Sequence, residues 1–460
     1  MQHRQPLEAR VAPEPSGPID RAALVAWYRR NRDRSRALFD LLIDEDDFYS
    51  RPIALRHPFV FYAGHVPAFS FNTLVKTALG APAIDPALET LFARGIDPPT
   101  DQQAAGDGAF DRDLWPSVAV VRQFAREADS RVIDALTRAD IDRPGHPLLH
   151  GAEAAFVILE HEAMHQETLL YMLHRLPPDR KRRPGGDRPR VEGGAPRRSW
   201  IEIPAGRATM GIDRTAERFA WDNEGPRHAE QVSGFVMERH DVTNAAFMEF
   251  VDAGGYQEPG FWNPADWEWV RRENLRHPLF WERHAQGWFW RGMFESIALP
   301  PAWPVYVTWA EAEAYARWRG ARLPTEAEFQ RAAYGTPAGD ERRFPWGDAP
   351  PDARHGVFDF TSWDPAPAGS HPDGRSAWGV EDLVGNGWEW TRTPFAPFPG
   401  FGPQATYPEY SADFFDGDHF VLKGGSPATA SDLLRPTFRN WFRRRYPYAY
   451  ATFRCVRERA

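Results

Sequence analysis

The sequence has one cysteine, no long apolar run and no excess of basic residues, and each of these shortages excludes a class of protein. Because Cys455 is the single cysteine among 460 residues, a disulfide framework, a cysteine-ligated zinc site and a redox pair are excluded. No stretch reaches the ~18 consecutive apolar residues of a membrane-spanning helix. The 55 basic residues are outnumbered by 64 acidic ones. The composition therefore argues against nucleic acid or a membrane as the main partner.

The N-terminal segment carries no export signal. Residues 1–19 are polar, contain proline and lack the apolar stretch of a secretory signal peptide. Together with the missing disulfides, this indicates a cytoplasmic protein that begins with a disordered arm.

A change of composition at residues 177–199 divides the chain. This segment is rich in Pro, Gly and Arg and has no apolar periodicity, so we interpret it as a basic linker between domains at 20–176 and 200–460. Before it, apolar residues recur at helical spacing around 24–42, 59–79, 118–136 and 149–174. Four such segments predict a four-helix bundle, a scaffold that can place metal ligands on facing helices.

The second domain has a different pattern. Trp, Gly and Pro accumulate and apolar runs are short, which predicts a mixed α/β domain with little regular secondary structure. Thr308 and Thr325 are suited to cap helices at Trp309–Arg319 and Glu326–Tyr334. Short strands are expected at Trp200–Ile203, His228–Met237 and Phe420–Leu422.

The strongest chemical signal is the pair His161 and His165 in the fourth predicted helix. Residues four apart share a helix face, so the two imidazoles can bind one metal ion. Apolar neighbours indicate that this helix is largely buried, and an unpaired imidazole would be costly there. We therefore predict a metal site. Glu167 lies about 200° around the helix from His165, so we expect it to support the structure rather than bind the metal.

The same residues spell His-Glu-x-x-His, the signature of zinc hydrolases that use the glutamate as general base. In the extended form of that motif a glycine would stand at position 168, which is Thr168 here. A zinc hydrolase using Glu162 remains an alternative. A binding module without turnover is a second alternative, and it would tolerate loss of the histidines.

A third metal ligand is expected from another helix. His65 lies in an apolar setting, beside Gly64, which would allow a close approach of neighbouring elements. His57, His146 and His150 compete for this role.

The sequence resembles the iron-dependent sulfoxide and selenoxide synthases of ergothioneine, ovothiol and selenoneine biosynthesis. Three features carry this resemblance: Gly64-His65, the later motif His161-x-x-x-His165-x-Glu167, and a Trp-rich second half. The second half also resembles the formylglycine-generating-enzyme (sulfatase-modifying factor) domain. The motifs that carry this second resemblance are Trp221-Asp222-Asn223-Glu224, Pro226-x-His228, Val242-Thr243-Asn244, the run from Arg322 to Glu328, Pro345-Trp346-Gly347, the run from Gly385 to Thr391, Gly424-Gly425-Ser426 and Phe453-Arg454. The two resemblances cover nearly everything after residue 20.

The resemblance implies a DinB-like four-helix bundle at residues 20–176, followed by a C-type-lectin-like FGE-sulfatase domain at 200–460. It implies an Fe(II) ion held by His65, His161 and His165, O2 as co-substrate and, as in some relatives, a structural Ca2+. Formylglycine generation needs a cysteine pair, so this chain cannot perform it.

The resemblance further implies the substrate hercynine, the betaine of histidine. In the family an Asn-Trp pair near the C-terminus holds it, and Asn440-Trp441 matches that pair. A trimethylammonium group cannot donate N–H hydrogen bonds, so aromatic faces and carbonyl dipoles must recognise it. Phe442 replaces the Asp with which mycobacterial-type ergothioneine synthases contact γ-glutamylcysteine. The family's proton-donating tyrosine has no aligned counterpart, and Tyr407 and Tyr410 are the candidates.

The chalcogen donor distinguishes the branches of this family. The run from Arg56 to His65 and the run from Arg94 to Asp97 resemble ovothiol and selenoneine synthases. Ovothiol synthases normally carry a C-terminal methyltransferase domain, which this sequence does not show. We therefore expect a selenoneine synthase that uses a selenosugar. An ergothioneine-type enzyme using cysteine or γ-glutamylcysteine is the first alternative, and an ovothiol-type 5-histidylcysteine sulfoxide synthase is a more remote one.

Overall fold

The computed structural model describes residues 17–93, 112–185, 189, 191, 193–213 and 217–459. Most of the expected N-terminal arm, part of the linker and the run from Arg94 to Asp97 lie outside these residues. The chain forms two compact units. The first comprises Met1–His165, Ile212–Pro226 and Gly400–Ser411, and the second comprises Gln166–Gly211, Arg227–Pro399 and Ala412–Ala460.

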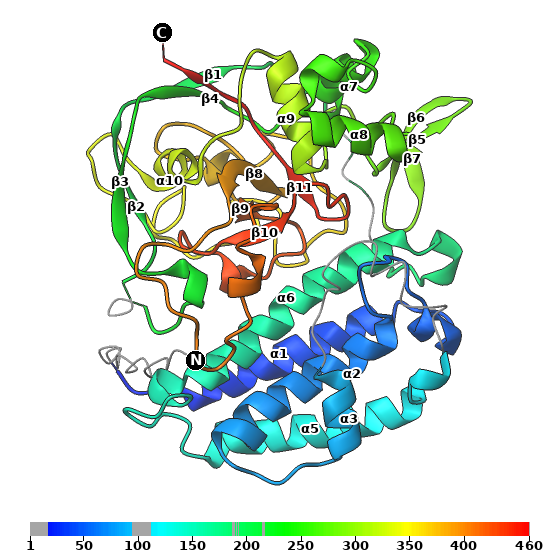
Figure 1. The fold of residues 1–460 in the computed structure, drawn as a ribbon, viewed down its shortest axis with the longest axis vertical. Coiled ribbons are helices and arrows are strands. Elements are labelled where there is room, and N and C mark those ends of the chain that lie inside the picture. The colour runs from blue at the N-terminus through cyan, green and yellow to red at the C-terminus, as the bar shows by residue number, and fades with distance from the viewer. Residues whose placement is uncertain are drawn as a thin grey trace, which may run out of the picture. The chain divides into compact units, whose positions relative to one another are not determined.

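The first unit is built from long helices, as the apolar periodicity predicts (Figure 1). Its described α-helices are α1 (Arg21–Phe39), α2 (Phe59–Ser70), α3 (Pro86–Phe92), α5 (Val118–Arg138) and the part of α6 (Glu153–Arg175) that ends at His165. Wider π-helical turns continue α2 over Phe71–Ala78. Asp20 and Ser117 cap α1 and α5 by accepting hydrogen bonds from backbone N–H groups in the first turn.

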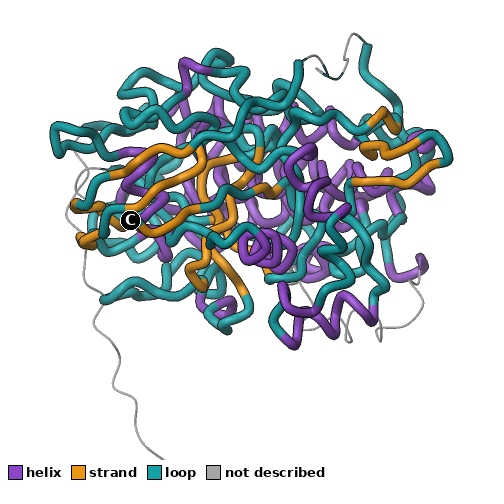
Figure 2. Tube along the Cα trace, turned by 90° about the horizontal axis from the view of Figure 1, so that it is seen from above, coloured by secondary structure: helices purple, strands orange, loops and turns teal. Residues whose placement is uncertain are grey.

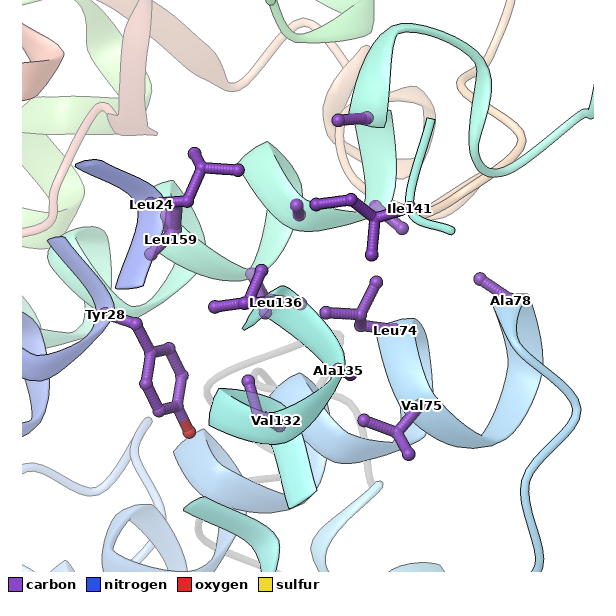
Figure 3. Packing of buried hydrophobic residues seen from close by; sticks show 14 of the residues in the cluster. Leu24, Tyr28, Leu74, Val75, Ala78, Val132, Ala135, Leu136, Ile141 and Leu159 are labelled. Carbon is purple, nitrogen blue, oxygen red and sulfur yellow. The ribbon is translucent and has the colours of Figure 1, made fainter. Parts of the chain in front are cut away.

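The core of the first unit lies where these helices meet. Leu24 and Tyr28 of α1, Leu74 beyond α2, Leu136 of α5 and Leu159 of α6 are buried in one cluster (Figure 3). Leu24 and Tyr28 are four residues apart and so share one face of α1, and burial of such apolar faces stabilises the bundle.

The described residues of the second unit form four small sheets. Their strand orders are β1-β4-β12, β10-β9-β8-β11, β2-β3 and β5-β6-β7. The strands are β1 (Trp200–Ile203), β2 (Gly206–Met210), β3 (His228–Val232), β4 (Phe235–Glu238), β5 (Trp281–His284), β6 (Gly287–Arg291), β7 (Ser296–Ala298), β8 (Gly387–Pro394), β9 (His419–Gly425), β10 (Asn440–Arg443), β11 (Ala451–Thr452) and β12 (Val456–Glu458). Loops and turns connect them over long stretches, as the composition predicts (Figure 2).

Helices of the second unit include α7 (Asn244–Asp252), α8 (Pro264–Arg272), α9 (Trp309–Trp318) and α10 (Glu326–Tyr334). Thr308 and Thr325 cap α9 and α10 in reciprocal arrangements with Glu311 and Glu328, which confirms both predicted caps. The prediction of a single strand at His228–Met237 is wrong, because this segment forms two strands. The chain leaves the ladder at residues 233–234, so β3 pairs with β2 and β4 pairs with β1.

Arg454 organises the centre of the second unit. Its guanidinium is fully buried and forms ion pairs with Glu389 and Asp241, at 2.7 and 3.0 Å. It also donates to backbone carbonyls of Glu238 and Glu381. A buried cation with this many partners ties the C-terminal segment to β4 and β8.

Among the described residues, none of the helices combines the length and apolar character needed to cross a bilayer.

Candidate metal centre

His65, His161 and His165 meet in the interior of the first unit. The Nε2 atom of His165 lies 3.2 Å from that of His65 and 3.1 Å from that of His161. All three side chains are buried, and one ligand nitrogen from each lies within 4.8 Å of the others. They form the one group of this kind that the described residues contain. The structure therefore brings together the three residues singled out in the sequence.

Gly64 and Phe92 fix the orientation of His65. A Cβ atom at Gly64 would lie 2.3 Å from the Phe92 ring, so only glycine lets α3 pack this closely against α2. At that contact the Nδ1–H of His65 donates a 2.7 Å hydrogen bond to the carbonyl of Phe92. Since a carbonyl can only accept, the neutral ring carries its proton on Nδ1 and leaves the Nε2 lone pair facing the other two histidines.

Burial keeps the three imidazoles neutral. It lowers the pKa of His65 to about 4, although the hydrogen bond to the Phe92 carbonyl opposes this shift. Burial and the neighbouring imidazoles lower the pKa of His161 and of His165 well below the ordinary value. Three neutral imidazoles whose Nε2 atoms converge are a suitable ligand set for a divalent transition metal, because the metal supplies the positive charge that the lone pairs attract.

Aromatic rings enclose the histidines. Phe61 stacks on His65 with ring centroids 4.9 Å apart, and Phe69 stacks on His161 at 3.5 Å. The ring of Tyr62 lies 5.6 Å from that of His165. This apolar lining lowers the local dielectric constant and restricts the rotamers of the ligands.

The competing histidines lie outside the cluster. His57 packs against Phe61 and Trp115. His146 and His150 accept hydrogen bonds from backbone N–H groups in the loop that joins α5 to α6. None of the three belongs to the group of converging ligand atoms.

Glu162, which would be the general base of a zinc hydrolase, is held against α1. Its side chain is fully buried, and Oε1 accepts hydrogen bonds from Arg32 at 2.9 Å and Ser35 at 2.7 Å. Burial raises its pKa and the nearby Arg32 opposes that rise. A general base must reach the water that it activates. The Oε1 atom of Glu162 is engaged by α1, while its buried Oε2 atom has no hydrogen-bond partner among the described residues.

The two candidate tyrosines differ in their surroundings. The ring of Tyr407 lies 6.1 Å from that of His161 and 5.2 Å from that of Phe69. Tyr410 stacks on Trp221 at 3.9 Å, and its hydroxyl donates to the sulfur of Met164 at 3.3 Å. Both belong to the segment Gly400–Ser411, which is part of the first unit. Of these two candidates, Tyr407 is the one whose ring lies beside a histidine of the cluster.

Trp221 and Glu160 were not predicted as neighbours of the site. The Trp221 Nε1–H donates to Glu160 at 2.8 Å, and both side chains are buried. The motif that contains Trp221 is visible in the sequence, but periodicity does not reveal that Ile212–Pro226 packs with the helical unit.

Asn440, Trp441 and Phe442 lie on β10, an edge strand of the second unit. Successive side chains of a strand point to opposite faces, so Asn440 and Phe442 share one face and Trp441 projects from the other. Trp441 stacks on Phe395 with centroids 4.3 Å apart, and Phe442 stacks on Tyr446 at 4.8 Å. All three side chains are half-buried.

Glu167 lies in the second unit and is committed to structure, as its helical position indicates. Its carboxylate accepts hydrogen bonds from Trp388 at 2.8 Å, Ser426 at 2.7 Å and Thr429 at 3.1 Å. Two of these donors stand in the sequence motifs around residues 385–391 and 424–426. Burial raises the pKa of Glu167, and the three donors oppose that rise.

Comparison with known proteins agrees with both halves of the architecture. The Sulfatase-modifying factor enzyme 1-like domain family matches residues 190–459, and the DinB superfamily matches residues 28–169. These matches confirm the predicted combination of folds.

Curated relatives share this sequence over most of its length. The hercynine oxygenase of Mycolicibacterium smegmatis is 39% identical, over 71% of this chain and 75% of that protein. The hercynine oxygenase of Mycolicibacterium thermoresistibile is 41% identical, over 71% and 72% respectively. Ergothioneine biosynthesis protein 1 of Neurospora crassa is 28% identical over 91% of this chain, which matches 56% of the longer fungal protein.

Proposed function

The chain belongs to the hercynine oxygenase family of enzymes, and from this premise we propose that it uses Fe(II) and O2 to form a carbon–chalcogen bond at the imidazole ring of hercynine. The observation that carries the proposal is the convergence of three neutral imidazoles in a buried site. Three nitrogen ligands leave other coordination positions open for substrates. Fe(II) bound there would supply the redox chemistry that couples reduction of O2 to formation of the new bond.

The residues of the first unit hold and orient the metal. His65, fixed by the Phe92 carbonyl, and His161 and His165 on α6 provide the ligands, while Phe61 and Phe69 restrict access of bulk water. The position of Glu162 favours this assignment over a zinc hydrolase, because its carboxylate is engaged by α1.

Asn440 and Trp441 are the residues that we assign to hercynine. An indole face attracts a trimethylammonium cation through the electrostatics of its ring. Phe395 stacks on the Trp441 ring, which holds the indole in a fixed orientation. Asn440 lies at the edge of its sheet, and its Oδ1 accepts a 2.8 Å hydrogen bond from the backbone N–H of Trp441. The second lone pair of that oxygen can face the same cation.

Tyr407 is the residue that we assign to proton transfer. Its ring lies beside His161 and Phe69. The hydroxyl of Tyr410, by contrast, donates to Met164, and the Tyr410 ring is stacked on Trp221.

We assign a selenosugar as the chalcogen donor. Phe442 offers no charge to the amino-acid carboxylate or amine of a thiol donor such as γ-glutamylcysteine. Its stacking on Tyr446 instead presents an apolar surface. Aromatic surfaces of this kind suit a neutral, ring-shaped donor.

The experiment that tests the proposal offers donors in parallel. The chain is loaded with Fe(II) without oxygen and then given hercynine, O2 and one of three donors: cysteine, γ-glutamylcysteine or a selenosugar. Mass spectrometry reads the products. A hercynine–selenosugar adduct or its selenium-containing breakdown product is expected. A cysteine-derived sulfoxide without a selenium product would retain the iron site and overturn the donor.

A further inference from the structure

The carboxylate of Glu162 lies in a network of charged side chains on the side of α6 that packs against α1, and all of them except Arg36 are buried. Arg32 donates to Glu162 through Nη1 at 2.9 Å and pairs through Nε with Asp129 of α5, also at 2.9 Å. Asp129 in turn accepts from Tyr28 at 2.9 Å and from Arg36 at 2.8 Å. Two cations thus balance two carboxylates across three helices.

The α1 side of this network is a single polar stripe. Tyr28, Arg32 and Ser35 are spaced by four and three residues, which places them on one face of the helix. All three are buried, with at most 5% of their surface exposed. Burying a guanidinium there is costly unless its carboxylate partners stay in place, so the stripe favours the observed position of α6.

We propose that Glu162 is a positioning residue, which sets the rotation of α6 so that His161 and His165 project toward His65. On a helix Glu162 lies about 100° from His161 and about 60° from His165. Anchoring its carboxylate to Arg32 and Ser35 therefore fixes the direction of both imidazoles. In this chain the glutamate of the His-Glu-x-x-His motif aims the metal ligands and takes no part in proton transfer. The inference rests on the proposed metal site.

The chain supplies a matched control for this role. Asp129 carries the same charge and contacts the same arginine, but it lies on α5, which provides none of the three histidines. A substitution there weakens the network without releasing the carboxylate of α6. Glu162→Gln and Asp129→Asn each remove one negative charge with little change of volume.

The test is Co(II) titration of the full-length apoprotein, followed by absorption spectroscopy, with thermal unfolding of the same samples. Both variants are expected to unfold at lower temperature than the unchanged protein. Glu162→Gln is expected to bind Co(II) about tenfold more weakly and with an altered ligand-field spectrum, while Asp129→Asn stays within about twofold. Ser35→Ala removes one of the two anchoring donors and should weaken binding in the same direction, which covers the case in which Glu162→Gln does not fold.

Two results would overturn the inference. Equal Co(II) affinity in Glu162→Gln, Ser35→Ala and the unchanged protein would show that the network only stabilises the fold. An equal loss in Asp129→Asn and Glu162→Gln would show that general loosening of the bundle, rather than the anchor on α6, controls the ligands. If the unchanged protein bound no Co(II), the proposed metal site itself would fail, and the inference with it.

Discussion

His65 and His165 are separated by 100 positions in the chain, and their Nε2 atoms lie 3.2 Å apart. At this distance a proton on one Nε2 atom can form a hydrogen bond to the other. The Nε2 atom of His161 then faces the lone pair of a neighbouring imidazole without a proton between them. A divalent cation at this point satisfies all three nitrogens. The arrangement is thus suited to a bound metal ion, and the first prediction concerns its three ligands.

Replacing any one histidine of the cluster by alanine is expected to abolish activity and to weaken binding of the metal at least about 100-fold, because only two ligands remain. Iron content after anaerobic loading measures the effect. His146→Ala is the control, since His146 lies in a loop and contacts backbone N–H groups. Full iron occupancy in His161→Ala would contradict the assignment.

Tyr407 and Tyr410 make a matched pair for a test of proton transfer. Tyr407→Phe is expected to lower kcat at least about 100-fold with little change in KM, the size of a general acid–base contribution. Tyr410→Phe loses the hydrogen bond to Met164 and is expected to retain most of the activity. Steady-state kinetics with the preferred donor decides between them. If Tyr410→Phe has the larger effect, the assignment passes to Tyr410.

Phe442 is expected to control the choice of donor. Phe442→Asp places a carboxylate in a half-buried position beside Tyr446, where it can pair with the amine of a thiol donor. We expect the ratio of kcat/KM for γ-glutamylcysteine to that for the selenosugar to rise by about tenfold or more, as one charge-assisted hydrogen bond allows. Phe442→Leu keeps an apolar side chain and serves as the control. An unchanged ratio in Phe442→Asp would remove Phe442 from the donor site.

His174 is expected to make the protein less stable in acid. Burial lowers its pKa to about 3, with Lys181 and the arginines nearby acting in the same direction. Its nitrogens contact the Tyr450 hydroxyl at 3.0 Å and the Arg291 carbonyl at 2.6 Å. The unfolded chain binds a proton near pH 6.5 and the folded chain does not, so the unfolded state gains protons first as the pH falls. The contribution of His174 to the free energy of unfolding is complete above pH 6.5. It decreases as the pH falls from 6.5 to about 3.

The size of this effect is roughly 3 kcal/mol between pH 6.5 and pH 4. Urea unfolding of the unchanged protein and of His174→Gln at both pH values measures it. The variant is expected to lose less stability than the unchanged protein over the same interval. Equal losses would show that His174 is not neutral in the fold.

Arg454 provides a prediction on stability. Arg454→Met leaves Glu389 and Asp241 buried without their cation and is expected to cost about 3–5 kcal/mol. Arg459→Met removes an exposed ion pair with Glu202 and is expected to cost less than about 1 kcal/mol. Denaturant unfolding of both variants gives the comparison. Similar values for the two would contradict the central role given to Arg454.

The sequence predicted those features that depend on local spacing. The positions of His161 and His165 follow from a four-residue helical repeat, and the caps at Thr308 and Thr325 follow from the chemistry of the first helical turn. His65 needed the resemblance to a family, because its spacing to the other ligands carries no periodic signal.

Features that depend on long-range packing were not predicted. Ile212–Pro226 and Gly400–Ser411 follow the linker in sequence but belong to the helical unit, where Trp221 contacts Glu160. The direction of Glu162 was equally hidden, because it depends on the buried stripe of α1 that contains Arg32. Loop packing and the pairing of buried charges are set by tertiary contacts, and no local pattern encodes them.

The most direct test of the central claim is the uptake of O2 by the Fe(II)-loaded protein in the presence of hercynine and a selenosugar, measured beside a Zn(II)-loaded sample and His161→Ala. We predict that O2 and hercynine are consumed together by the iron form, and that the hydrogen on the imidazole carbon is lost as the new bond forms. The zinc form and the variant should consume neither. Consumption of hercynine by the zinc form without O2, or no loss of hydrogen from the ring, would contradict the account.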